Sequence, residues 1–246
     1  MPTLFESVVS AVTLFMGSTV LSTIGFGIGM TTIPILLFIL EPQTVIVVVN
    51  TVSVALFILI VHQNRDELPF RRVGPWAAAG LLGVPVGVLI LRDSDAGLLK
   101  IAITSITIVL TLVVAFNVRA RIPSGLLVGL VVAFVVSVTL NALGIGGPIM
   151  ALYMLTQNWS RNAVRGALSL YFLFVEAAGV VGYGITGLLT TERIALILIA
   201  VVPVTLGFLL ATYLVKRMND VVFRRATVAA IIGMSGLVLA REIAAL

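Results

Sequence analysis

Long apolar runs without charged residues recur along almost the whole chain, and most of them are long enough to cross a lipid bilayer. A helix needs about 20 apolar residues to span the hydrocarbon core, which is about 30 Å thick. Only 10% of the 246 residues are charged, 60% are hydrophobic and the mean hydropathy is +1.23, so charges are too few to cover a water-facing surface. We therefore predict an all-α polytopic membrane protein. Its apolar segments are 5–23, 30–40, 44–61, 73–91, 96–116, 122–140, 149–156, 163–185, 194–214 and 221–240.

This composition excludes an ordinary cytosolic enzyme, a disordered chain and a disulfide-stapled secreted domain. The net charge is +5, but the basic residues stand in short loops between apolar runs and are not interleaved with aromatic residues, so we expect no nucleic-acid partner. There is no cysteine, and the single histidine, His62, stands at the end of a span. We therefore expect no metal, no cofactor, no catalytic residues and no enzymatic activity.

Two of the ten segments, 30–40 and 149–156, are too short to cross a bilayer, and each follows a cluster of glycines. Each glycine costs a helix about 1 kcal/mol, so three within a few positions interrupt it. Pro148 suits the start of a new helix, where its missing N–H is not needed. We predict short helices that begin at about Met30 and Pro148. The clusters contain three glycines each: Gly25, Gly27 and Gly29 in the first, and Gly144, Gly146 and Gly147 in the second.

The two interruptions divide the chain into similar halves. Gly27 and Gly144 are 117 residues apart, nearly half of the chain, and residues 50–53 align with residues 166–169 at a spacing of 116. We interpret this pattern as a duplicated unit. The first repeat, 1–121, has a broken-helix hairpin at 5–40 and spans at 44–61, 73–91 and 96–116. The second repeat, 122–246, has a hairpin at 122–156 and spans at 163–185, 194–214 and 221–240.

The positions of the fifteen basic residues distinguish two topologies. If each broken pair is a hairpin, eleven fall on one side of the membrane and four on the other, whereas continuous crossings divide them seven to eight. Because cytoplasmic loops are enriched in Lys and Arg, we predict hairpins, two inverted repeats and both termini outside the plasma (inner) membrane. Inverted repeats with interrupted helices are typical of secondary transporters. The eleven are Arg65, Arg71, Arg72, Arg119, Arg121, Arg161, Arg165, Lys216, Arg217, Arg224 and Arg225, and the four are Arg92, Lys100, Arg193 and Arg241.

The glycine breaks predict an anion site. Inverted repeats would aim the N-termini of the two short helices at each other near the membrane midplane, and each end carries free N–H groups and partial positive charge. Two such ends bind an anion without a buried Lys or Arg. The alternative is that the glycines are helix-packing notches. We favour packing for Gly83/Gly87 and Gly125/Gly129, and the anion site for the repeated clusters.

Hydroxyl and amide side chains near the breaks would complete this site, although Ser and Thr in membrane helices often bond only to backbone carbonyls. The candidate substrate-binding residues are Ser22, Thr23, Gly25, Gly27, Gly29, Thr31, Asn50, Asn141, Gly144, Gly146, Gly147, Arg165 and Ser169.

One acidic and one basic residue stand out in segment 163–185. Glu176 is mid-span without an adjacent cation, and an intramembrane carboxyl group is a candidate proton carrier. The alternative is a hydrogen-bonded structural role. Arg165 is eleven residues earlier, about 20° around the helix and about 16 Å along it. It would form an electrostatic mouth of the cavity or contact lipid phosphate.

The glycine clusters resemble those of the sulfite exporter TauE/SafE family, within the 4-toluene sulfonate uptake permease superfamily. The matching features are residues 22–29 with Pro34 downstream, and residues 143–148 followed by residues 165–169. The resemblance extends over essentially the whole chain. It implies a plasma-membrane carrier for sulfite or organic sulfonates that is driven by an ion gradient.

Together these features lead to the hypothesis of a proton-coupled secondary carrier. Its expected partners are a small anion (sulfite or a sulfonate) and the lipid bilayer, and a homodimer stays open. An anion channel with the same site, an intramembrane hydrolase and a structural or sensing subunit are the competing hypotheses. A hydrolase needs a nucleophile paired with a base inside the membrane, and no Cys, His or Lys stands near the breaks.

Overall fold

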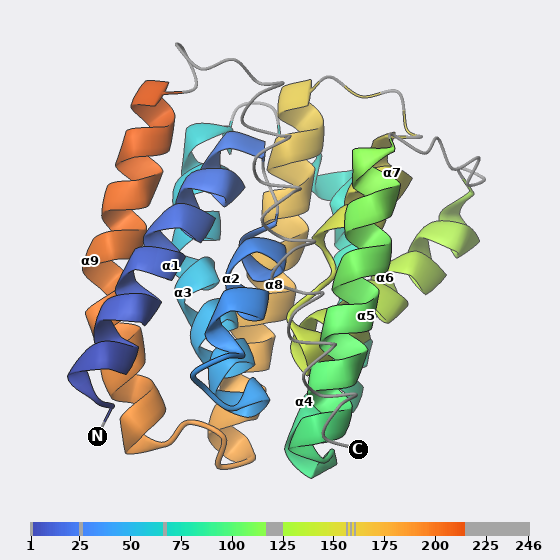
Figure 1. Ribbon diagram of the computed structural model, residues 1–246. Helices are drawn as coiled ribbons and strands as arrows, with labels where there is room; N and C mark the ends of the chain where they lie inside the picture. The colour runs from blue at the N-terminus through green and yellow to red at the C-terminus, as the bar shows by residue number, and fades with distance from the viewer. Residues whose placement is uncertain are drawn as a thin grey trace.

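A computed structural model describes residues 2–24, 27–65, 68–116, 125–155, 157, 159 and 161–214, and in these it contains nine α-helices and no strand (Figure 1). The helices are α1 (Leu4–Ile24), α2 (Ile28–Leu36), α3 (Pro42–Gln63), α4 (Phe70–Asp93), α5 (Ala96–Ala115), α6 (Leu126–Leu143), α7 (Gly147–Leu155), α8 (Arg161–Ile185) and α9 (Thr191–Leu214).

Seven of the helices in the described part of the chain are long and apolar enough to cross a membrane, and α2 and α7, with nine residues each, are not. The prediction of an all-helical, multi-pass membrane protein is therefore confirmed. The span predicted at 221–240 lies outside the described residues.

Local sequence explains several helix ends. Thr3 and Glu6 form a capping box at the start of α1: Glu6 Oε2 accepts from the Thr3 N–H at 2.7 Å, and Thr3 Oγ1 accepts from the Glu6 N–H at 3.2 Å. Asp95 Oδ1 accepts from the Gly97 and Leu98 N–H groups at the start of α5. Such caps satisfy N–H groups that have no partner within the helix.

The two short helices begin earlier than the sequence predicts. Gly27 (φ 103°), before α2, and Gly144 (φ 70°), after α6, adopt the left-handed conformation, and the short helices start at Ile28 and Gly147. The first also ends earlier, at Leu36 instead of residue 40. Pro34 lacks an N–H, and tighter turns follow, with the Phe38 N–H bonded to the Ile35 carbonyl.

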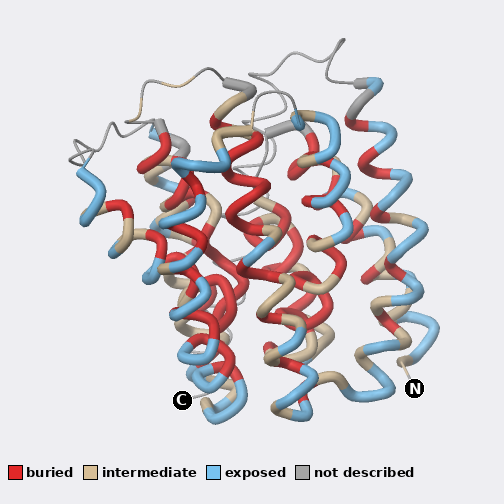
Figure 2. Tube along the Cα trace, turned by 180° about the vertical axis from the view of Figure 1, so that it is seen from behind, coloured by how far each residue is buried: buried red, intermediate tan, exposed pale blue. Residues whose placement is uncertain are grey.

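Helices from opposite halves of the chain pack side by side. Along its length α1 lies against α9, α4 lies against α6, and α3 contacts α8 at the centre. Figure 2 shows buried residues concentrated where these helices face one another, with exposed residues on the outer faces. The exposed outer residues include many large apolar side chains, such as Leu82, Leu127 and Val202. This distribution is the one expected for helices whose outer faces meet lipid.

Small residues permit the closest of these contacts. A Cβ on Gly83 or Gly87 of α4 would lie 2.7 Å from a carbonyl oxygen of α6, and a Cβ on Gly207 of α9 would lie 2.5 Å from the Phe15 carbonyl oxygen of α1. Glycine therefore lets these backbones approach. The packing role predicted for Gly83 and Gly87 is confirmed. A Cβ on Gly129 would also lie too close to the Tyr153 and Trp76 side chains, whereas the prediction was wrong for Gly125, because no atom of the described residues lies within 4 Å of its Cβ position.

Basic residues gather at both ends of the helices, and more of them at one end. The C-terminus of α3 and the N-terminus of α8 lie together at the top in Figure 1, and the N-termini of α5 and α9 lie at the bottom. The helix ends at the top carry five basic residues in the sequence, Arg65, Arg71, Arg72, Arg161 and Arg165, and the helix ends at the bottom carry three, Arg92, Lys100 and Arg193. The remaining basic residues lie outside the described part of the chain: Arg119, Arg121, Lys216, Arg217, Arg224, Arg225 and Arg241.

The contact between α4 and α6 leads to a stability prediction. Gly83→Ala places a methyl group 2.7 Å from the Phe134 carbonyl oxygen, so we expect the free energy of unfolding to fall by about 1–3 kcal/mol. Gly74→Ala on the same helix is the control, because nothing lies within 4 Å of its Cβ position. Thermal unfolding in detergent measures both variants. Equal stability of the two would contradict the close packing.

Candidate functional site

The two glycine breaks meet in the interior of the molecule. A Cβ on Gly29 would collide with the Gly144 carbonyl oxygen, and a Cβ on Gly144 would collide with the Ile33 side chain. Segments that are more than one hundred residues apart in the sequence are thus in direct contact. This approach is possible because neither glycine has a side chain.

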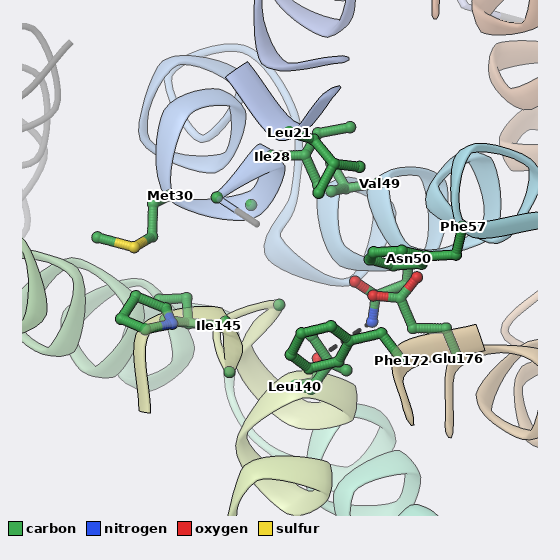
Figure 3. A pocket seen from close by; sticks show the side chains of 16 residues that line it. Leu21, Ile28, Met30, Val49, Asn50, Phe57, Leu140, Ile145, Phe172 and Glu176 are labelled. Atoms are coloured by element: carbon green, nitrogen blue, oxygen red, sulfur yellow. Dashed lines mark hydrogen bonds between the residues drawn. The ribbon is translucent and has the colours of Figure 1, made fainter. Parts of the chain in front are cut away.

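A pocket of about 30 Å³ lies where the breaks meet (Figure 3). One water molecule needs about 10–15 Å³ of such space, so the pocket has room for about two waters or one small oxyanion. Both breaks contribute to its wall, together with side chains of α1, α3, α6 and α8. Of the predicted site residues, those that line it are Gly27, Gly29, Asn50, Gly144, Gly146, Gly147 and Glu176.

The pocket adjoins the N-termini of both short helices. In α2 the backbone bonding begins with the Thr31 N–H donating to the Gly27 carbonyl at 3.1 Å, and in α7 with the Met150 N–H donating to the Gly146 carbonyl at 3.2 Å. The N–H groups before these residues have no partner within their helices. Two helix ends with partial positive charge therefore border one small space.

Glu176 is the one acidic or basic side chain among the described residues that line the pocket. Its side chain extends from α8 into the pocket beside Asn50 and Phe172 (Figure 3). Only 3% of Glu176 is exposed, and its Oε2 has no hydrogen-bond partner in the described part of the protein. A buried carboxyl oxygen without a partner is energetically costly, which indicates a site that accepts a proton or a ligand.

Asn50 joins α3 to α6 and α8 through a buried hydrogen-bond network. Its Nδ2 donates to the Leu140 carbonyl at 3.0 Å and to the Tyr183 hydroxyl at 2.9 Å, and that hydroxyl donates to the Asn141 carbonyl at 3.1 Å. Both amide hydrogens of Asn50 are thus used within the protein. The network fixes the C-terminal turn of α6, directly before the break at Gly144.

Arg165 is half-buried and does not line the pocket. Its Nη2 donates to the Ser22 carbonyl at 2.8 Å, and its Nε is buried without a partner among the described residues. Ser22 is in the last turn of α1, where carbonyls lack helical partners and a cation is favourable. In this structure Arg165 therefore ties α8 to the end of α1.

Several predicted site residues stand apart from the pocket. The hydroxyls of Ser22, Thr31 and Ser169 donate to carbonyls of their own helices, and Asn141 Nδ2 donates to the Ser137 carbonyl. None of the four is among the residues that line the pocket. Gly25 lies outside the described residues, as does the side chain of Thr23.

Among the residues near the site that the sequence did not predict are Tyr183, Phe57 and Phe172. Phe57 and Phe172 line the pocket, and their ring centroids are 5.5 Å apart. Tyr183 follows Glu176 by seven residues, which is two turns on the same face of α8. That spacing was the available signal for Tyr183, whereas no local pattern distinguishes the two phenylalanines from other apolar residues.

No group of three or more His, Cys, Asp or Glu side chains that could hold a metal ion occurs within the residues that the structure describes.

The family model described as Sulfite exporter TauE/SafE matches residues 9–238, which is most of the chain. No curated protein and no solved structure matches it.

The Asn50 network leads to a prediction of energetic coupling. Asn50→Ala and Tyr183→Phe remove two ends of the same hydrogen bond, so the double variant should lose about 0.5–3 kcal/mol less stability than the sum of the single variants. Tyr171→Phe on the same helix is the control, because that hydroxyl donates to the Ala133 carbonyl instead. Its effect should add to that of Asn50→Ala. Denaturant unfolding in detergent measures the cycle, and additivity with Tyr183→Phe would contradict the network.

Proposed function

The chain belongs to the TauE/SafE family of sulfite exporters, a family of membrane transporters, and we propose that it is a secondary transporter of a small sulfur-containing anion, either sulfite or an organosulfonate. The observation that carries this proposal is the pocket bordered by two helix N-termini that come from the two glycine breaks. Those helix ends would bind the anion through backbone N–H groups.

The donors at this site suit an oxyanion. Backbone N–H groups at helix ends supply hydrogen bonds and partial positive charge without the desolvation cost of a buried Lys or Arg. The glycines Gly27, Gly29, Gly146 and Gly147 would let the anion approach the backbone closely. The small volume of the pocket favours sulfite over an aromatic sulfonate.

The helix arrangement supports two inverted repeats. If α1–α5 correspond to the chain from α6 onward, α1 is equivalent to α6 and α4 to α9. The contact between α1 and α9 then corresponds to the contact between α6 and α4. In the same way, the contact between α3 and α9 corresponds to the contact between α8 and α4. The two central helices, α3 and α8, run antiparallel, as inversion requires. Repeats of this kind support alternating access to a central site.

The charge distribution supports an orientation with the Arg65 and Arg165 end in the cytoplasm. The N-terminus of α1 lies at the opposite end of the molecule, so it would be outside a plasma membrane (Figure 1).

Glu176 is the proposed proton carrier. An ionised carboxylate in the pocket would repel an anion, whereas a protonated one would donate a hydrogen bond to it. Anion binding should therefore be strongest at pH values at which Glu176 is protonated and should weaken as pH rises. This relation would couple the anion to a proton gradient.

Uptake of radiolabelled sulfite into proteoliposomes tests the proposal. We expect saturable uptake that a pH gradient drives uphill, which a channel cannot do. Gly29→Ala should reduce uptake by about tenfold or more, the equivalent of about 1.4 kcal/mol, because its Cβ collides with the Gly144 carbonyl oxygen. Gly74→Ala, with open space at its Cβ, should retain uptake. Protein-free liposomes correct for leak, and transport of cations alone would refute the anion site.

Glu176→Gln tests the coupling. This substitution keeps the shape of the side chain but fixes it in a neutral state, so exchange of sulfite across the membrane should persist and lose its pH dependence. Uphill accumulation driven by a pH gradient should disappear. Exchange and accumulation are measured in the same vesicles. Wild-type accumulation by the variant would show that another group carries the proton.

A further inference from the structure

Eight of the nine described helices form two bundles that do not coincide with the two halves of the chain, and α5 makes small contacts with both bundles. The first bundle consists of α1, α2, α3 and α9, and the second of α4, α6, α7 and α8. Each takes one helix from the other half of the sequence: α9 packs along α1 in the first, and α4 packs along α6 and α8 in the second. The main contact between the bundles is the pair α3 and α8.

The pocket lies on the boundary between these bundles. Gly29 and Asn50 belong to the first bundle, and Gly146 and Glu176 belong to the second. A movement of one bundle relative to the other would therefore open or close the pocket, whereas a movement within one bundle would leave its opposite wall in place.

Three contacts follow one another along α3 and α8, which run antiparallel. Asn50 contacts Tyr183, Phe57 contacts Phe172, and Asn64, directly after α3, faces Gly166. Glu176 comes between Phe172 and Tyr183 on α8, so the pocket is between the first two contacts. Along these two helices the phenylalanine pair lies between Glu176 and the end of the protein that carries Asn64.

The two contacts that enclose the pocket differ in chemistry. Separation of Asn50 from Tyr183 would leave buried donors and acceptors unpaired. Separation of the Phe57 and Phe172 rings leaves no polar group unsatisfied, and the rings are joined only by a tilted contact at 5.5 Å. The hydrogen bond from Arg165 to the Ser22 carbonyl also links the two bundles. It lies nearer to the Asn64 end of the protein than the pocket does.

We infer that Phe57 and Phe172 are the gate of the pocket toward the Asn64 end, and that the gate opens when the two bundles separate as rigid bodies. The role of the phenylalanine pair as a gate rests on the proposed transport function. The opening of the pocket at this pair can be tested without a substrate. The rocking units are thus the mixed bundles and not the sequence repeats.

Two engineered disulfides distinguish motion of the mixed bundles from motion of the sequence halves, and the chain has no cysteine of its own. The Asn64→Cys, Gly166→Cys pair joins the bundles, and a Cβ on Gly166 lies 3.5 Å from Asn64 Cβ. The Val88→Cys, Gly182→Cys pair lies within the second bundle, and a Cβ on Gly182 lies 3.7 Å from Val88 Cβ. Disulfides need Cβ separations of about 3.5–4.5 Å. Both pairs join the two halves of the sequence, but only the first pair joins the two bundles. The second pair is therefore a matched control.

We expect the Asn64–Gly166 disulfide to reduce sulfite uptake by at least about tenfold, with recovery on reduction, and the Val88–Gly182 disulfide to leave uptake within about twofold of the reduced protein. Arrest by both disulfides would show that the sequence halves move, and arrest by neither would show that the bundles need not separate. Either result overturns the inference.

A second measurement does not depend on sulfite. Val49→Cys places a single thiol in the wall of the pocket, and a membrane-impermeant thiol reagent is added from either side. Phe57→Ala with Phe172→Ala should speed labelling about tenfold from the Asn64 side only. Phe174→Ala, an exposed phenylalanine on the same helix, should not change it. An unchanged rate, or an increase from the opposite side, would refute the gate. Failure of sulfite uptake by the parent protein, with this labelling result, would refute only the proposed substrate.

Discussion

Lipid offers no hydrogen bonds, and this constraint determines where the chain can be interrupted. A helix satisfies its own backbone, whereas a broken helix leaves N–H and carbonyl groups that must find partners inside the protein. The breaks between α1 and α2 and between α6 and α7 are both in the interior, surrounded by the long helices. The long helices surround the described parts of the breaks, and the first N–H groups of α2 and α7, which have no partner within their own helices, border the pocket.

Glycine gives this interior its shape in two different ways. At the breaks, Gly27 and Gly144 adopt backbone conformations that other residues resist. Along α4 and α9, Gly83, Gly87 and Gly207 instead bring one helix against the carbonyls of another. Glycine therefore contributes both to the pocket at the centre and to the closest helix–helix contacts around it. Membrane helices depend on such contacts because lipid gives little hydrophobic drive for their association.

Periodicity and composition predict the parts of this structure that depend on local sequence. The apolar runs predict the long helices, and the glycine clusters predict both breaks and the glycines that line the pocket. Glu176 is detectable because a carboxyl group in an apolar run is rare. The pairing of α1 with α9 is not predictable in this way, since it depends on which helix faces fit together. Phe57 and Phe172 were missed for the same reason, whereas the spacing of Tyr183 from Glu176 was a signal in the sequence. Arg165, predicted at the mouth of the cavity or at lipid phosphate, bonds to the Ser22 carbonyl.

The exchange of helices between the bundles has a consequence for biosynthesis. The ribosome completes α1 long before α9, because residues 25–190 separate them. During that interval the α1 face that holds Ser18 and Thr19 lacks its final partner, Gly207. The first bundle cannot close until the last described helix enters the membrane. Assembly of the two bundles is therefore a late and mutually dependent event, and a truncated first half would expose polar surface that only the second half covers.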